Sequence, residues 1–444
     1  MAKPSGLRAL FDFRREEIPF ALLMFSYFFL VITSFWILKP IKKTIFIQHY
    51  DVSGLHLLGS HLSGAQAELI AKVLNMGVAF VAVVVFTMLA NRLRRQQLTL
   101  VFSAFFAVCY VVYARLLGDP GDMTVWSFYL FGDLFSTLMV ATFFAFLNDS
   151  VTPDAAKRIY GLVGLGGVTG GVFGSSAVRV LIERVERAEW LWICLGLVAL
   201  IALLAWAAGR IVDRNPPPES PSKQPEPEEP SRENPALEGA KLVFRSRYLL
   251  SIVAIVGLYE IVSTVVDFQF SATIAHFLDG DAIGRQFSTV FAFTNIVALV
   301  VQLFLTSFVM TRFGVGTALL VLPFAVLAGS AGFMILPILW VGSLLNTADN
   351  GFSYSINQSA KEALYVPTSK DEKYKAKAFI DMFVQRFAKA LAVGVSLGIT
   401  LTFQDFSSVR WLSAFTLPVI VLWVIAARYA GRHFNELSGD AEES

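Results

Sequence analysis

The sequence predicts an all-α polytopic membrane protein with about twelve transmembrane helices, arranged as two six-helix halves. Three observations lead to this fold class. The 444 residues are 55% hydrophobic and only 16% charged, with 40 phenylalanines, which is far from the composition of soluble domains. Long apolar stretches recur along the chain, and a proline-rich, charged segment interrupts them near the middle. The net charge of +2 gives no electrostatic argument for nucleic acid as a partner.

Six apolar stretches precede that interruption, each long enough to cross about 30 Å of hydrocarbon at about 1.5 Å per residue. The first shows no small-residue cleavage pattern after it, so we expect it to remain as a helix. The fifth is rich in glycine, and Gly161, Gly164 and Gly171 would let neighbouring backbones approach closely. A phosphate-cradling loop is the rival interpretation, but its motif spacing and preceding strand are missing. The expected spans are 18–39, 66–90, 98–117, 125–147, 160–182 and 189–208.

The interruption itself, residues 215–235, is rich in proline and charge and has no large apolar residue. This composition predicts an extended, disordered linker. We therefore expect an N-terminal half at 1–209, a linker region at 210–247 and a C-terminal half at 248–444. The second half contains six further expected spans, at 248–270, 287–310, 316–335, 338–356, 378–403 and 411–429.

Basic residues near the ends of these spans predict the orientation, because short cytoplasmic loops retain lysine and arginine. Alternate loops are rich in basic residues and the loops between them are poor, so both termini should face the cytoplasm, across a bacterial inner membrane. Two sets of six helices joined by a cytoplasmic linker are typical of major-facilitator transporters. This analogy favours transport but names no substrate. The basic loops contain Arg92, Arg94 and Arg95; Lys157 and Arg158; Arg312; and Lys361, Lys370, Lys373, Lys375 and Lys377.

Charged side chains within spans are costly in lipid, so they are expected to face a cavity, a partner charge or the bundle interior. Lys39 and Lys42 lie three residues apart on one helical face, where two ammonium groups would suit phosphate oxygens; alternatively, they snorkel to the outer interface. Asp149 and Glu260 could pair with lysine when substrate is absent and release it when phosphate arrives. Asp149 could equally cap or end its helix at the cytoplasmic surface. Two further acids within spans are Asp133 and Asp267.

The tenth and eleventh spans also carry polar groups that do not suit lipid. Asn346 and Asp349 indicate that one face of the tenth span lines water or substrate, where it could contact base or ribose. Lys377 introduces the eleventh span, and Arg386 offers a planar fork for phosphate or carboxylate. The bias toward basic cytoplasmic loops does not explain Arg386 and Lys389, because both lie deeper in the span.

These residues resemble the ATP:ADP antiporter family, the nucleotide transporters of plastids and of intracellular bacteria. In the first span the family has a basic residue followed three positions later by lysine, and Lys39 and Lys42 occupy these two positions. Glu260 stands where the family has a functionally important acid, although Thr264 and Val266 replace the basic residues that follow it there. A second matching stretch comprises Asn148, Asp149, Ala156, Lys157, Arg158, Ile159, Tyr160, Gly164 and Gly166. The most specific stretch comprises Tyr354, Ser355, Lys361, Glu362, Tyr365, Pro367, Lys373, Lys375, Lys377, Asp381, Arg386 and Lys389.

The resemblance implies a transporter that moves nucleotides by alternating access, through ATP/ADP exchange or proton-coupled uptake. We expect Lys39, Lys42, Lys377 and Arg386 to hold phosphates. The alternative is transport of another phosphorylated or organic anion on the same scaffold.

An enzyme or a purely structural membrane partner is less well supported. The sequence has no nucleophile elbow or HExxH motif, and a protein used only for interaction would have little need for so many intramembrane charges. Cys109 and Cys194 are too few for a disulfide framework or a thiolate metal site. We therefore expect no metal and no cofactor, and the sequence is compatible with a monomer.

Overall fold

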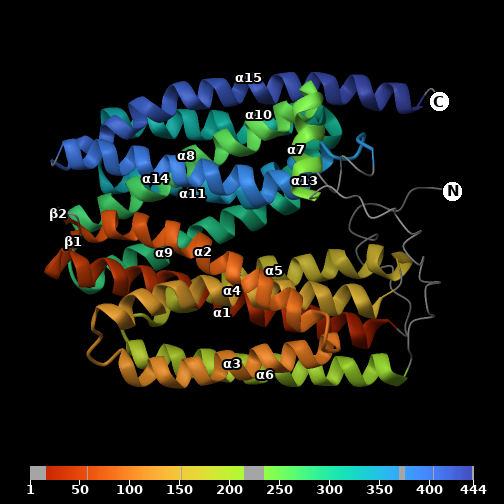
Figure 1. Ribbon diagram of the computed structural model, residues 1–444, viewed down its shortest axis with the longest axis horizontal. Coiled ribbons are helices and arrows are strands. Elements are labelled where there is room, and N and C mark those ends of the chain that lie inside the picture. The colour runs from red at the N-terminus through yellow and green to blue at the C-terminus, as the bar shows by residue number, and fades with distance from the viewer. Residues whose placement is uncertain are drawn as a thin grey trace. The chain divides into compact units, whose positions relative to one another are not determined.

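The computed structural model describes residues 17–57, 59–151, 153–214, 235–369, 376–403 and 405–442. Helices dominate these residues, and the sheet found among them is a short antiparallel hairpin of β1, Leu55–Leu57, and β2, Ser60–Leu62 (Figure 1). Nine helices of the described residues are long and apolar enough to cross a membrane. The predicted all-α polytopic class is therefore confirmed. The predicted linker, apart from Pro235, lies outside the described residues.

The chain divides into two compact units. The first takes its residues from Met1–Phe46, Leu74–Glu228 and Phe287–Ala292, and the second from Ile47–Val73, Glu229–Gln286 and Phe293–Ser444. Two of the N-terminal helices therefore contribute residues to both units. The boundaries predicted for the two halves, at 209 and 248, stay a prediction.

Every span predicted in the first half is present as a helix. The first helix continues well past its predicted end at residue 39, through Pro40, Lys42 and Lys43. As a result, the lysines of the first span belong to a continuous helix instead of a flanking loop. The helices are α1 Ile18–Ser53, α2 Gly64–Ala90, α3 Arg95–Leu116, α4 Asp122–Ser150, α5 Pro153–Leu181 and α6 Arg187–Arg214.

The glycine-rich helix α5 packs closely on α1. A Cβ atom added at Gly166, Gly170 or Gly174 would lie 2.5–2.7 Å from a carbonyl oxygen of α1. The Thr33 hydroxyl of α1 also donates a 3.2 Å hydrogen bond to the Gly170 carbonyl. The predicted role of this helix in close packing is confirmed at Gly166, Gly170 and Gly174, whereas the space around Gly164 is open. The glycines that contact α1 recur at every fourth residue, so they lie on one face of α5.

The second half begins with a short amphipathic helix and continues with six long helical segments. Three of these segments contain a π-helical turn, at Val301–Thr306, Ser353–Asn357 and Ile380–Val384, so the spans predicted at 287–310, 338–356 and 378–403 are helical but irregular. Gly314, at φ 81°, interrupts α10 where the sequence predicted the boundary between two spans. The helices are α7 Pro235–Arg245, α8 Arg247–Phe277, α9 Asp281–Val300, α10 Ser307–Ile335, α11 Leu339–Phe352, α12 Gln358–Ala363, α13 Lys377–Phe379, α14 Gln385–Thr402 and α15 Ser408–Glu442.

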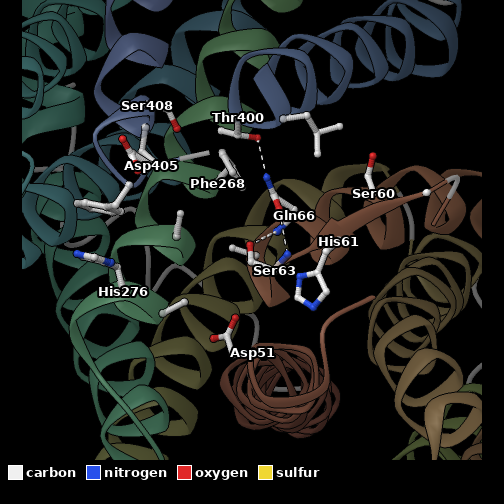
Figure 2. Close-up of a pocket in the computed structure, with 17 residues that line it drawn as sticks. Asp51, Ser60, His61, Ser63, Gln66, Phe268, His276, Thr400, Asp405 and Ser408 are labelled. Carbon is white, nitrogen blue, oxygen red and sulfur yellow. Dashed lines mark hydrogen bonds between the residues drawn. The ribbon is translucent and has the colours of Figure 1, made fainter. Parts of the chain in front are cut away.

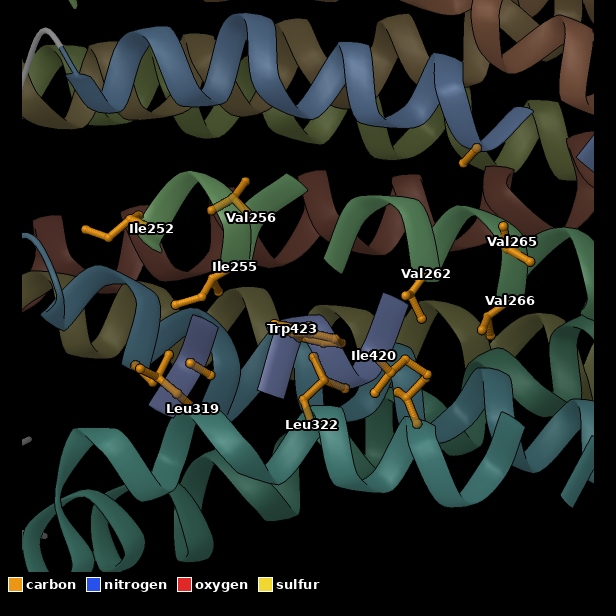
Figure 3. Packing of buried hydrophobic residues seen from close by; sticks show 14 of the residues in the cluster. Ile252, Ile255, Val256, Val262, Val265, Val266, Leu319, Leu322, Ile420 and Trp423 are labelled. Atoms are coloured by element: carbon orange, nitrogen blue, oxygen red, sulfur yellow. The ribbon is translucent and has the colours of Figure 1, made fainter. Parts of the chain in front are cut away.

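The core of the second unit lies where α8, α10 and α15 meet (Figure 3). Ile255 and Val262 of α8, Leu322 of α10 and Trp423 of α15 are all fully buried there. A Cβ atom added at Gly431 would lie 2.6 Å from the Cα atom of a glycine on α10. Such close backbone approach and dispersion hold transmembrane helices together, since lipid tails are as apolar as the side chains. This packing fixes α8, which carries the acids of the candidate site.

Substitution by alanine should have opposite effects at a glycine of α5 that contacts α1 and at one that does not. We expect Gly170→Ala to lower the thermal unfolding temperature of the detergent-purified protein, because the added methyl overpacks α1 at a cost of about 1–3 kcal/mol. Gly164→Ala is the matched control on the same helix, and it should leave that temperature unchanged or raise it, because alanine favours the helix by about 1 kcal/mol. Equal effects of the two substitutions would contradict the assigned contact.

Candidate functional site

Charged side chains within the helices form one cluster in each unit. In the first unit, Lys42 of α1 is only 4% exposed and forms an ion pair with Asp133 of α4. The Asn75 amide donates a 2.9 Å hydrogen bond to the same carboxylate, and the Lys42 ammonium lies 4.4 Å from the centre of the Tyr129 ring. A Cβ atom at Gly132 would lie 2.6 Å from the Lys42 side chain, so this glycine makes room for it.

Lys39, one turn earlier on α1, faces aromatic rings. Its ammonium lies 4.5 Å from the centre of the Trp36 ring and 4.7 Å from that of Phe291. Lys43 is buried and lies 5.3 Å from the centre of the Phe287 ring. Aromatic faces attract a cation, most strongly when it is desolvated. The predicted pair Lys39 and Lys42 therefore lies inside the first unit, and burial of Lys42 argues against snorkelling for that residue.

Asp149 is not part of this cluster. It lies near the end of α4, is 55% exposed and forms a 2.7 Å ion pair with Arg95. Sixteen residues of helix place it about 24 Å from Asp133 along α4. Its position fits the helix-end alternative, and the acid that pairs with Lys42 is Asp133.

The cluster of the second unit is built on α8. Glu260 lies 3.0 Å from the ammonium of Lys389 on α14. Two turns later, Asp267 lies 2.5 Å from the ammonium of Lys72, which also lies 3.9 Å from Glu68. Lys72 and Glu68 are not among the site residues predicted from the sequence. A signal was available, because they are the charged residues of the apolar stretch 66–90 and their spacing of four places them on one face.

Polar residues of α11 face the interior of the second unit. Asn346 and Asp349 are both fully buried, and the Ser263 hydroxyl of α8 donates a 2.7 Å hydrogen bond to the Asp349 carboxylate. The Asn346 amide has no hydrogen-bond partner among the described residues. A buried amide without a partner costs about 1–3 kcal/mol, so such a group marks a place for water or for a ligand.

Lys377 lies apart from Lys389. Twelve residues of helix separate them by about 18 Å, and Lys377 forms a 2.5 Å ion pair with Glu362 of α12. It lines a cavity of about 290 Å³ together with Lys361 and Tyr365. Arg386 is partly buried on α14. The predicted phosphate-binding residues therefore do not converge on one point within the second unit, and Lys373 and Lys375 lie outside the described residues.

A larger pocket in the second unit has a different character. It measures about 600 Å³ and receives Asp51, His61 and Gln66 from one side and His276 and Asp405 from the other (Figure 2). The Gln66 amide crosses it to donate a 3.1 Å hydrogen bond to Thr400. No lysine or arginine is among the described residues that line it, so it is poorly suited to phosphate. Across the described chain, no group of three His, Cys, Asp or Glu residues could hold a metal ion.

The ion pair of the first unit can be tested by a double-mutant cycle. We expect Lys42→Ala to destabilise the substrate-free protein by roughly 1–3 kcal/mol, between the values for exposed and buried pairs, because Asp133 is left without its cation. Adding Asp133→Ala should recover most of that loss in a thermal unfolding measurement. Additive losses from the two substitutions would mean that the side chains do not interact.

Comparisons with known proteins place the chain among membrane transporters. Residues 24–364 match the sequence model of the Major Facilitator Superfamily, and residues 334–434 match that of the TLC ATP/ADP transporter. The chain is 25% identical to ADP,ATP carrier protein 1 of Chlamydia muridarum, over 99% of this chain and 94% of the carrier. It is 23% identical to the chloroplastic ADP,ATP carrier protein 1 of Arabidopsis thaliana, over 96% of this chain and 75% of that protein.

Solved structures show the same fold at low sequence identity. The nucleoside transporter NupG matches with a TM-score of 0.62 and 12% identity, over 91% of this chain and 98% of that one. A bacterial homolog of the human lysosomal transporter Spinster matches with a TM-score of 0.59 and 14% identity, over 96% and 99%. The resemblance to ATP:ADP antiporters is confirmed by the match over residues 334–434. The chain belongs to the Major Facilitator Superfamily.

Proposed function

We propose that this protein is a membrane transporter of nucleotides, ATP and ADP or close relatives, that works by alternating access. The observation that carries the proposal is the match of residues 334–434 to the TLC ATP/ADP transporter. That stretch contains Asn346, Asp349, Lys377, Arg386 and Lys389. Carriers named for ADP and ATP also align with almost the whole chain, so the likeness extends to both units.

The chemistry of the two clusters supports an anionic substrate. Lys42 and Lys389 are each held by a carboxylate, Asp133 and Glu260 respectively. A phosphate oxygen can replace that carboxylate as the hydrogen-bond acceptor of the ammonium. Arrival of a phosphate therefore breaks a contact between two helices, and a ligand that binds one arrangement of the helices better shifts the population toward it.

The remaining assignments follow from this chemistry. We propose that Lys39 and Lys42 hold phosphates in the first unit, that Arg386 and Lys389 do so in the second, and that the buried amide of Asn346 meets base or ribose. Glu260 balances Lys389 when substrate is absent. Asp149 has no place in this scheme, because it is paired with an arginine at a helix end.

We propose exchange of ADP for ATP as the mode of transport, since the relatives are named as carriers of both. Proton-coupled uptake is the alternative. The membrane is a bacterial inner membrane with both termini in the cytoplasm, supported by the alternation of basic and non-basic loops. Each unit carries its own cluster of charges, so a single chain supplies both, which supports a monomer.

Transport by the purified protein in proteoliposomes tests the proposal. Vesicles loaded with ADP should take up labelled ATP, whereas empty vesicles should not, because exchange needs a substrate on each side. Lys389→Ala should reduce this uptake about tenfold or more, since it removes a charge-assisted contact of about 1.5–3 kcal/mol. Arg312→Gln, at an exposed residue of the second unit, is the control and should transport as the unchanged protein does.

Two other results would revise or overturn the proposal. Uptake into empty vesicles that depends on a pH gradient would replace exchange with proton coupling. No uptake of any nucleotide, together with counter-transport of a different phosphorylated or organic anion, would show that the fold is shared with the nucleotide carriers but the substrate is not.

A further inference from the structure

One lysine of the second unit is partly buried and has no ion pair within the described part of the chain. Lys361 lies on α12, five residues past the predicted end of the tenth span at 356. Its ammonium lies 5.1 Å from the centre of the Tyr259 ring. Burial lowers the pKa of Lys361, and the acids Glu260, Asp381 and Glu362 oppose that effect from beyond ion-pair distance.

The lack of an ion pair within the described residues distinguishes Lys361 from other lysines in the same unit. Lys72, Lys377 and Lys389 each lie within 3.0 Å of a carboxylate. A desolvated cation without such a partner is unfavourable, because the Coulomb attraction of acids beyond ion-pair distance does not offset its lost hydration. An anion bound from solution would supply that attraction. The position of Lys361 therefore fits a ligand site better than a structural role.

The cavity in front of Lys361 has the chemistry and size for such an anion. Two lysines, Lys361 and Lys377, line it, and the Lys377 ammonium lies 5.4 Å from the centre of the Tyr365 ring. Its volume of about 290 Å³ lies at the lower limit of pockets that enclose whole drug-sized ligands, so it suits a phosphate group and not an entire nucleotide. The lining residues are Val256, Gln358, Lys361, Glu362, Tyr365, Lys377, Asp381 and Gln385.

Two acids on the wall of the cavity are held by side-chain amides. Gln358 donates a 3.1 Å hydrogen bond to Glu362, and Gln385 donates a 3.2 Å hydrogen bond to Asp381. Glu362 also lies 2.5 Å from the ammonium of Lys377. Glu362 therefore already forms an ion pair with one of the two lysines. An incoming anion must compete with Glu362 for Lys377 but not for Lys361.

We propose that Lys361 and Lys377 form an anion subsite that takes the terminal phosphate of a nucleotide, with Glu362 as the counter-ion that this phosphate displaces. The subsite lies at the end of the second unit that its basic loop marks as cytoplasmic. Its anion chemistry rests on the cavity, and the choice of a nucleotide rests on the proposed function. A phospholipid headgroup carries the same phosphate chemistry, so the test includes both sources.

The test compares two substitutions with opposite expected signs in the full-length, detergent-purified protein. Lys361→Gln should raise the apparent Kd for ATP, measured by thermal stabilisation, about tenfold or more, because one charge-assisted contact is lost. The substrate-free protein should stay as stable or become more stable, because the substitution removes a partly buried charge that has no ion pair among the described residues. Glu362→Gln should instead lower the Kd for ATP several-fold, since the competitor for Lys377 is gone. Arg312→Gln is the control and should change neither quantity.

Adenosine, inorganic phosphate and phosphatidylglycerol serve as comparison ligands. Adenosine lacks phosphate, so both substitutions should leave its effect unchanged. An unaltered Kd for ATP together with a less stable Lys361→Gln protein would overturn the subsite while leaving nucleotide transport intact. A response to phosphatidylglycerol alone that depends on Lys361 would overturn the nucleotide assignment in favour of lipid.

The proposed function can fail separately from the subsite. In that case the unchanged protein would respond to no nucleotide, yet inorganic phosphate would stabilise it, and Lys361→Gln would abolish that stabilisation. This result would support an anion subsite and overturn the nucleotide as its occupant.

Discussion

A charge placed within an apolar helix needs a partner, and the packing of the charged helices follows from this constraint. Lys42 joins α1 to α4, Lys389 joins α14 to α8, and Lys72 joins the start of α2 to α8. Each contact is between different helices, so satisfying the charge also fixes which helices are neighbours. Because both partners lose hydration, such pairs add little net stability. They are therefore well suited to being broken and remade by a charged ligand.

Close contacts between small residues complement these ion pairs. Gly170 and Gly174 of α5 meet the backbone of α1, the helix that carries Lys39 and Lys42. Gly431 similarly meets α10 next to the core that holds α8. Tight backbone contact at glycine holds these helices together without polar side chains, and so keeps the lysines and acids at fixed positions. The charged residues can then change partners while the helices that carry them remain packed.

The sequence predicts the helices well because length and apolar composition are local properties. Even the break at Gly314 falls between two predicted spans. Ion-pair partners are different, since they depend on which helices become neighbours. Asp133 and Asp149 lie on the same helix, and the pairing role predicted from the sequence was given to Asp149, yet Asp133 is the acid that pairs with Lys42. The spacing of Lys72 from Glu68 indicates a shared helix face but not the partner Asp267 on another helix, and no local feature of the sequence predicts the π-helical turn at 353–357.

Pairing of lysines with carboxylates also bears on selectivity among anions. A ligand that binds Lys42 or Lys389 must displace Asp133 or Glu260, each with a single negative charge. A carboxylate ligand offers the same charge and the same acceptor atoms as the resident acid, so the exchange gains little. A terminal phosphate carries a charge of about −1.5 to −2 and three acceptor oxygens, so it gains Coulomb energy and hydrogen bonds in the same exchange. If Lys42 and Lys389 bind substrate as proposed, the resident acids therefore favour phosphorylated substrates over simple carboxylates.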